Sequence, residues 1–136
     1  MDAQKTILVV DDDPDVVTVV KGILNSGDYK VLCAYNGEQV FTRLQEERPD
    51  LIILDIKMPE MDGLEVLKRL KTAPETSYIP VVLLTGNGQY HDVLKGYRLG
   101  TDYYMSKPFT SAQLINGIHL LLGDGNAQRG VSESIR

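Results

Sequence analysis

The stretch LIILD, residues 51–55, is the clearest structural signal in this chain, because four consecutive apolar residues lead directly into one aspartate. Two further runs of the same kind are ILVV at residues 7–10 and VVLL at residues 81–84. A strand that is apolar on both faces belongs in a parallel sheet covered by helices on both sides. These three runs therefore predict buried parallel strands, and residues 30–34 and 102–105 predict two weaker ones.

The segments between these runs carry apolar residues at helical spacing, which predicts five helices. Asp13 is a good N-cap for the first of them, and Pro14 is tolerated in a first turn. The predicted helices span about residues 14–26, 37–47, 63–73, 90–99 and 110–122. Strict alternation with right-handed crossovers predicts a doubly wound α/β fold, in which a five-stranded parallel sheet of order 2-1-3-4-5 is flanked by five helices.

Length and charge narrow the class of protein. The 136 residues fit one domain over residues 1–122, followed by a flexible tail or linker stub at 123–136, where periodicity stops. No apolar run approaches the length of a membrane span, so we expect no membrane association and a cytoplasmic location. The net charge of −5 argues against direct, sequence-independent binding to nucleic acid, which needs many Lys and Arg contacts to phosphates.

Polar residues follow the predicted strands at the point where each strand ends. Asp11, Asp12 and Asp13 follow the first strand, and Asp55 ends the third. Open α/β sheets bind ligands outside the carboxyl ends of their strands, at the point where the strand order reverses. Here that point lies between the first and third strands, so these carboxylates are expected to meet there.

Carboxylates that meet in a partly dry crevice repel one another unless a cation lies among them. Oxygen ligands together with water suit Mg²⁺, with Mn²⁺ as an alternative. Taken alone, the Asp11–Asp13 triplet is better interpreted as solvated turn residues with one helix cap. Asp55 on the neighbouring strand end weakens that interpretation, because the fold brings the two groups together.

Asp55 leaves a buried strand directly into the crevice, where a carboxylate can attack a phosphoryl group if the negative charge is offset. Thr85 follows the fourth strand and can donate a hydroxyl hydrogen bond to a phosphoryl oxygen. Lys107 follows the fifth strand and can pair with another. Either residue alone would be an ordinary structural threonine or solvated lysine. Together they supply the positioning and charge neutralisation that phosphoryl transfer requires.

Four segments together resemble the signature set of response-regulator receiver domains of two-component signalling, over about residues 5–122. They are ILVVDDD at 7–13, DIKMPEMDG at 55–63, LTG at 84–86 and YMSKPF at 104–109. The resemblance implies a flavodoxin-like fold. It also implies that Asp55 is the phosphoacceptor and a Mg²⁺ ligand, that Asp12 binds Mg²⁺ directly and Asp11 often through water, and that the backbone carbonyl of Lys57 is a further ligand.

The resemblance also implies roles for residues on the fourth and fifth strands. Thr85 and Lys107 match the hydroxyl and the ammonium that hold the phosphoryl group. Tyr104, rather than Tyr103, matches the aromatic switch residue that turns inward when the threonine is drawn toward the phosphate. In similar proteins the peptide bond between Lys107 and Pro108 is cis.

The function so implied is a phosphorylation switch and not an enzyme acting on other molecules. A sensor histidine kinase or a histidine phosphotransfer protein would donate the phosphoryl group. A downstream effector would bind the face formed by the fourth helix, fifth strand and fifth helix. The predicted final helix, residues 110–122, holds no Asp, Glu, Lys or Arg, so the charged dimer network of transcription-factor relatives is largely missing. A weak homodimer is left open.

Three alternatives compete with this interpretation. A Mg²⁺-dependent phosphohydrolase with an aspartyl nucleophile commonly has a second acid two residues later, where this chain has Lys57. A pseudo-receiver, which binds partners without being phosphorylated, typically lacks one of the acidic residues, the threonine or the lysine, and all are present here. A flavin-binding protein would need a phosphate-cradling loop where the Asp11–Asp13 triplet would repel phosphate. The lifetime of the phosphorylated state, with Lys57 beside Asp55, is left open.

Overall fold

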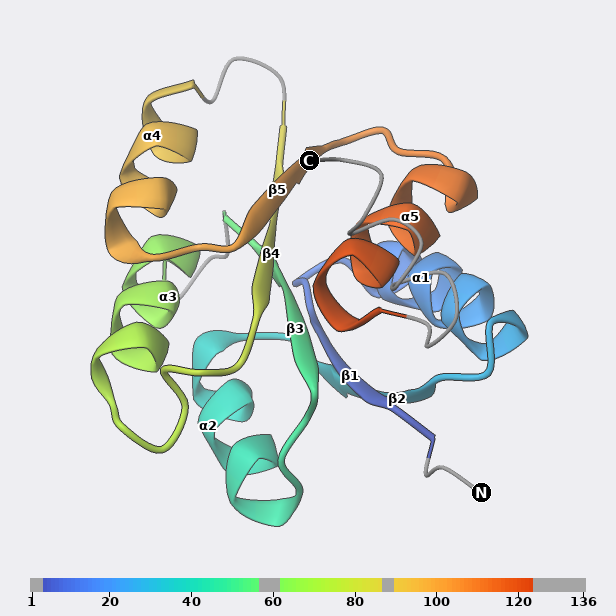
Figure 1. The fold of residues 1–136 in the computed structure, drawn as a ribbon, viewed down its shortest axis with the longest axis horizontal. Coiled ribbons are helices and arrows are strands. Elements are labelled where there is room, and N and C mark those ends of the chain that lie inside the picture. Colours follow the sequence, from blue (N-terminus) through green and yellow to red (C-terminus); the bar gives the residue numbers. More distant parts are fainter. Residues whose placement is uncertain (1–3, 57–61, 87–89, 124–136) are drawn as a thin grey trace.

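The computed structural model describes residues 4–56, 62–86 and 90–123. Five strands form one parallel sheet in the order β2-β1-β3-β4-β5 (Figure 1), which confirms the predicted fold class and strand order. The strands are β1 Thr6–Val10, β2 Lys30–Ala34, β3 Leu51–Asp55, β4 Val81–Thr85 and β5 Tyr103–Ser106.

Five helices connect and flank these strands, also as predicted. They are α1 Pro14–Ser26, α2 Gly37–Glu46, α3 Gly63–Thr72, α4 Tyr90–Leu99 and α5 Ser111–Leu122. Several expected bounds differ from the observed ones by one residue. Glu47 is already extended two residues before Pro49, Thr110 is the N-cap of α5, and Asp102 uses its carboxylate to accept the Val81 N–H at 2.8 Å.

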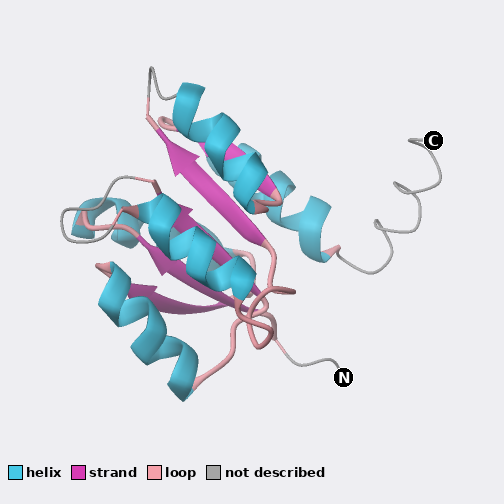
Figure 2. Cartoon of the chain, turned by 90° about the vertical axis from the view of Figure 1, so that its left-hand side faces the viewer, coloured by secondary structure: helices cyan, strands magenta, loops and turns pink. Residues whose placement is uncertain are grey.

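The helices form two layers, with α1 and α5 on one face of the sheet and α2, α3 and α4 on the other (Figures 1 and 2). Alternate residues of each strand enter separate cores. In β3, Ile52 and Leu54 pack on the α2–α4 side, whereas Leu51 and Ile53 pack on the α1–α5 side, and all four are fully buried. Burial on both faces explains why this strand has no polar residue before Asp55.

The described residues extend just past the last helix, and they also include every helix that can be tested for crossing a membrane. Helix α5 ends at Leu122, and the predicted tail lies outside the described residues apart from Gly123, so the domain boundary stays a prediction. Within the described ranges, no helix is long and apolar enough to cross a membrane.

Candidate functional site

The ends of β1 and β3 bring the predicted carboxylates together. The two strands are paired, with Val10 opposite Leu54, so the residues that follow leave the sheet side by side. One carboxylate oxygen from each of Asp11, Asp12 and Asp55 lies within 4.8 Å of the others. Asp11 is 0% exposed and Asp55 only 7%, whereas Asp12 is exposed, so the cluster is buried on the protein side and open to solvent on the other.

Asp13, the third member of the triplet, has a different role. Its side chain accepts the Asp15 N–H at 2.9 Å and caps α1, as predicted for a helix cap. Its own N–H donates to Asp11 Oδ1 at 3.0 Å. Asp13 therefore fixes the start of α1 and the orientation of the Asp11 carboxylate, and it is not one of the three clustered carboxylates.

Lys107 directly follows the edge strand β5, and its side chain extends past the end of β4 to reach these carboxylates. Its Nζ lies 2.9 Å from Asp11 Oδ2 and 3.4 Å from Asp55 Oδ1. Its backbone N–H donates to the Thr85 carbonyl at 2.7 Å, which ties the ends of β4 and β5 together. The peptide bond between Lys107 and Pro108 is cis, as the family resemblance implied.

Partial burial lowers the pKa of Lys107, but its hydrogen bond to Asp11 and the charges of Asp55 and Asp11 outweigh burial and leave that pKa raised. Lys107 is therefore a cation throughout the physiological pH range. The Lys107 ammonium contacts two of the three clustered carboxylates, those of Asp11 and Asp55, so among the described residues of the cluster negative charge exceeds positive charge. A divalent cation on the open side, beside Asp12, would offset that charge.

Thr85, at the end of β4, is the last of the predicted site residues that lie at this edge of the sheet. It is buried, and it follows Leu84, which is opposite Asp55 in the β3–β4 pairing. The Ile56 N–H donates to the Leu84 carbonyl at 3.0 Å and holds the two strand ends in register just below the crevice. The structure therefore gathers Asp11, Asp12, Asp55, Thr85 and Lys107 from four strand ends at one edge of the sheet.

One predicted residue is not gathered at this edge. Tyr104 is 42% exposed, and its ring packs against Tyr97 of α4 rather than toward Thr85. Lys57, whose backbone carbonyl the resemblance assigned to Mg²⁺, lies outside the described residues.

Sequence reasoning missed the parts played by Gly63 and Tyr97. The Gly63 N–H donates to the Ile56 carbonyl at 2.7 Å, which seats the start of α3 against the end of β3. The Asp62-Gly63 pair at a helix entry was a signal that such a close approach exists. No local signal marks Tyr97, because its partner Tyr104 belongs to a different element.

We expect the Lys107→Met variant to be less stable than the parent at neutral pH, by about 1–3 kcal/mol, because buried carboxylates lose a partner but water still reaches the site. The folded-state pKa of Lys107 lies above its unfolded value. Its stabilising effect is therefore fully present below the ordinary lysine pKa of about 10 and is lost only as the pH rises through the raised value. The deficit of the variant should therefore be present at neutral pH and should shrink only at strongly alkaline pH, where the Lys107 ammonium of the parent loses its proton.

Urea unfolding at neutral and at strongly alkaline pH, with a chelator present, measures this difference. The matched control is Lys68→Met, which removes the charge of an exposed lysine on α3 and should change stability by less than about 0.5 kcal/mol. A Lys107→Met deficit that is the same at both pH values would contradict the electrostatic account.

Comparison with known proteins places these residues in a family context. The family model described as "Response regulator receiver domain" matches residues 7–119. The alkaline phosphatase synthesis transcriptional regulatory protein PhoP of Bacillus subtilis is 38% identical over 110 residues, which are 81% of this chain and 45% of that protein. The response regulator Rre1 of Synechocystis is 40% identical over 110 residues, 80% of this chain and 48% of that protein. The chain thus spans about half the length of the curated relatives it matches.

Solved structures agree with this result. A putative response regulator from Chloroflexus aurantiacus has a TM-score of 0.85 and 30% identity, over 90% of this chain and 100% of that chain. The receiver domain of the sensor histidine kinase PA1611 of Pseudomonas aeruginosa has a TM-score of 0.81 and 28% identity, over 90% of this chain and 100% of that chain. That structure has a magnesium ion coordinated in its active-site cleft.

Proposed function

Because the chain belongs to the response regulator receiver domain family, we propose that it is a phosphorylation switch that accepts a phosphoryl group on Asp55 in a Mg²⁺-dependent reaction. One observation carries this proposal. Carboxylate oxygens of Asp11, Asp12 and Asp55 lie within 4.8 Å of one another, and the Lys107 ammonium lies 3.4 Å from Asp55 Oδ1. The arrangement provides a nucleophile, oxygen ligands for a cation, and a positive charge for a phosphoryl oxygen.

In the proposed reaction a carboxylate oxygen of Asp55 attacks phosphorus. The bond that breaks joins phosphorus to an imidazole nitrogen of a phospho-histidine donor, and that nitrogen keeps the electron pair and takes up a proton. Asp11, Asp12 and Asp55 would hold Mg²⁺, which supplies the positive charge that offsets the negative charge of the attacking and transferred groups. Lys107 would pair with one phosphoryl oxygen, and the Thr85 hydroxyl would donate to another.

The switch itself would run through Thr85 and Tyr104. Both lie on strand positions that face the α2–α4 side of the sheet, since Leu83, opposite Tyr104, packs on that side and Thr85 is two residues further along β4. Movement of the Thr85 hydroxyl toward a phosphoryl oxygen would leave room for Tyr104 to turn inward. This rotation would change the α4-β5-α5 face, where a downstream effector protein or domain would bind.

A donor must reach Asp55, so it contacts the rim of the crevice. A groove of about 450 Å³ lies at this rim between the first half of α1 and the loop after β5, and it is lined by Asp15, Val16, Val19, Lys107, Pro108 and Phe109. Val19 is 58% exposed although it is apolar and lies in a helix. We propose that a sensor histidine kinase or a histidine phosphotransfer protein docks here, with apolar side chains of its own against Val19.

We expect Val19→Asp to slow phosphotransfer from a phospho-histidine donor at least tenfold, because it places a charge in an apolar interface. Phosphorylation by acetyl phosphate, which needs no docking, should be unchanged within twofold. Thr18→Asp adds the same charge at the neighbouring exposed position of α1, outside the groove, and is the matched control. Equal transfer rates for the Val19 and Thr18 variants would contradict the docking site.

The alternatives fit the geometry less well. A pseudo-receiver needs neither a buried, paired Asp55 nor a lysine between two carboxylates, and both are present. A phosphohydrolase acting on other substrates is disfavoured by Lys57 at the position of its second acid. We therefore propose that the chain catalyses only its own phosphorylation and dephosphorylation, and that it does so in the cytoplasm.

The test is incubation of the protein with acetyl phosphate in the presence and absence of Mg²⁺, followed by intact-protein mass spectrometry. We expect the mass of one phosphoryl group to be gained only with Mg²⁺, and borohydride trapping followed by peptide mapping should locate it at Asp55. Uptake that is independent of Mg²⁺, or a phosphoryl group on another residue, would contradict the proposed function.

A further inference from the structure

The aromatic ring of Tyr97 packs edge-to-face against the ring of Tyr104. Tyr97 lies on α4 and Tyr104 on β5, and their ring centroids are 5.8 Å apart with an interplanar angle of 90°. This edge-to-face geometry is a favoured one for aromatic pairs. Tyr97 and Tyr104 are 45% and 42% exposed, so both residues are partly covered and partly open to solvent.

The backbone around Tyr97 is fixed by packing and by hydrogen bonds. At the preceding residue, a Cβ added to Gly96 would collide with the Leu83 side chain, so α4 lies directly on β4 at this point. The Thr101 N–H donates to the Gly96 carbonyl at 2.9 Å, and the Gly100 N–H donates to the Tyr97 carbonyl at 3.1 Å. Gly100 has a φ of 104°, which ends the helix. Tyr97 is therefore presented to β5 from a rigid base.

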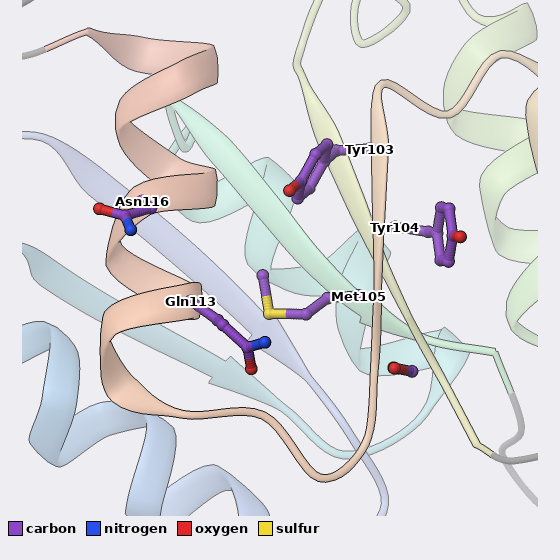
Figure 3. Close-up of a pocket in the computed structure, with 6 residues that line it drawn as sticks. Tyr103, Tyr104, Met105, Gln113 and Asn116 are labelled. Carbon is purple, nitrogen blue, oxygen red and sulfur yellow. The ribbon is translucent and has the colours of Figure 1, made fainter.

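The Tyr104 side chain points to the side of the sheet that α4 covers. Along β5, Tyr103 and Met105 point toward Gln113 and Asn116 of α5, whereas Tyr104 points away from them (Figure 3). Leu83, opposite Tyr104 on β4, belongs to the core on the side of the sheet that α4 covers. Because Thr85 is two residues beyond Leu83, an inward turn of Tyr104 toward Thr85 must separate its ring from Tyr97.

We propose that Tyr97 is a positioning residue that holds Tyr104 in its outward orientation and so sets how readily Tyr104 turns inward when Asp55 is phosphorylated. The second half of this statement rests on the proposed function. Partial burial, and then the neighbouring Tyr104 and Tyr103, raise the pKa of Tyr97, so the Tyr97 ring is neutral at physiological pH. An edge-to-face pair is worth roughly a two- to tenfold change in an equilibrium constant. Loss of the Tyr97 ring should therefore favour the inward orientation by that factor.

The first arm of the test needs no phosphoryl analogue. The χ1 populations of Tyr104 are measured by NMR in the protein with ¹³C-labelled tyrosine, in the parent and in the Tyr97→Ala and Tyr97→Phe variants. Tyr97→Ala should raise the ratio of inward to outward Tyr104 about two- to tenfold, and Tyr97→Phe, which keeps the ring, should restore the parent ratio. Leu94→Ala, at another exposed apolar position of α4, is the matched control and should leave the ratio unchanged.

The second arm measures the affinity for beryllofluoride with Mg²⁺, a stable mimic of the phosphoryl group. Tyr97→Ala should tighten binding by the same two- to tenfold factor, and this gain should vanish in a Tyr104→Ala background, because the two residues act as one pair. An unchanged Tyr104 ratio in Tyr97→Ala, or an affinity gain that persists without Tyr104, would overturn the role of Tyr97. A parent protein that does not bind beryllofluoride would instead overturn the proposed function, while the first arm still decides the role of Tyr97 as a positioning residue.

Discussion

We expect the Asp55→Asn variant to take up no phosphoryl group from acetyl phosphate in the presence of Mg²⁺, under conditions in which the parent is fully phosphorylated. An amide oxygen has no negative charge and is a far weaker nucleophile than a carboxylate oxygen. The substitution also leaves only Asp11 and Asp12 in the cluster, so the affinity for Mg²⁺ should fall as well. The loss of phosphorylation should therefore be complete, not partial.

The variant should fold normally, because it removes one of three like charges and keeps the size and shape of the side chain. We expect it to be at least as stable as the parent in urea unfolding without Mg²⁺, since Lys107 still pairs with Asp11 at 2.9 Å. Loss of phosphorylation in a folded protein then reports on chemistry. A variant that still gains the mass of a phosphoryl group would show that another residue is the acceptor.

Asp13→Asn is the matched control, because it makes the same change of charge close by in the sequence. Asn is as good an N-cap as Asp, so the hydrogen bond from the Asp15 N–H to this side chain should be kept. Asp13 is not among the carboxylates that cluster with Asp55. Phosphorylation of this variant should match that of the parent within about twofold, and a large loss would mean that the start of α1 matters more than the cluster.

The fold could be predicted from the sequence because its signals are local. The runs at residues 7–10, 51–54 and 81–84 are apolar at every position, which only a sheet covered on both faces explains. The order of the strands then followed from connection rules, and it placed Asp11 and Asp55 at adjacent strand ends before any distance was known. The predicted grouping of the candidate site was a consequence of topology more than of any single motif.

What could not be predicted depends on contacts between distant elements. The distances from Lys107 to Asp11 and Asp55 depend on how far its side chain extends across two strands, which no spacing reveals. The Tyr97 contact with Tyr104 depends on the angle at which α4 lies on the sheet, and that angle is set by Gly96 against Leu83. Such packing details arise from tertiary structure, and helical periodicity carries no record of them.

The glycine at the start of α3 gives the largest expected effect on stability. A Cβ at Gly63 would stand well inside contact distance of the Asp55 carbonyl oxygen, 2.6 Å from the Ile56 carbonyl oxygen and 2.7 Å from Ile56 Cα. These are backbone atoms of a buried segment, so no flexible side chain can move aside. We expect Gly63→Ala to lower the free energy of unfolding by about 3 kcal/mol or more.

Gly22→Ala is the matched control in urea unfolding. Gly22 lies inside α1, and a Cβ added there meets nothing within 4 Å, so the same substitution should raise stability by about 0.5–1 kcal/mol. Opposite signs for the two variants would separate steric conflict from the general helix preference of alanine. The Gly63 variant should also phosphorylate more slowly, even where it is still folded, because relief of the clash must displace α3 or the end of β3 that carries Asp55. A Gly63→Ala protein as stable and as readily phosphorylated as the parent would show that the close approach of α3 to Asp55 is not required for either.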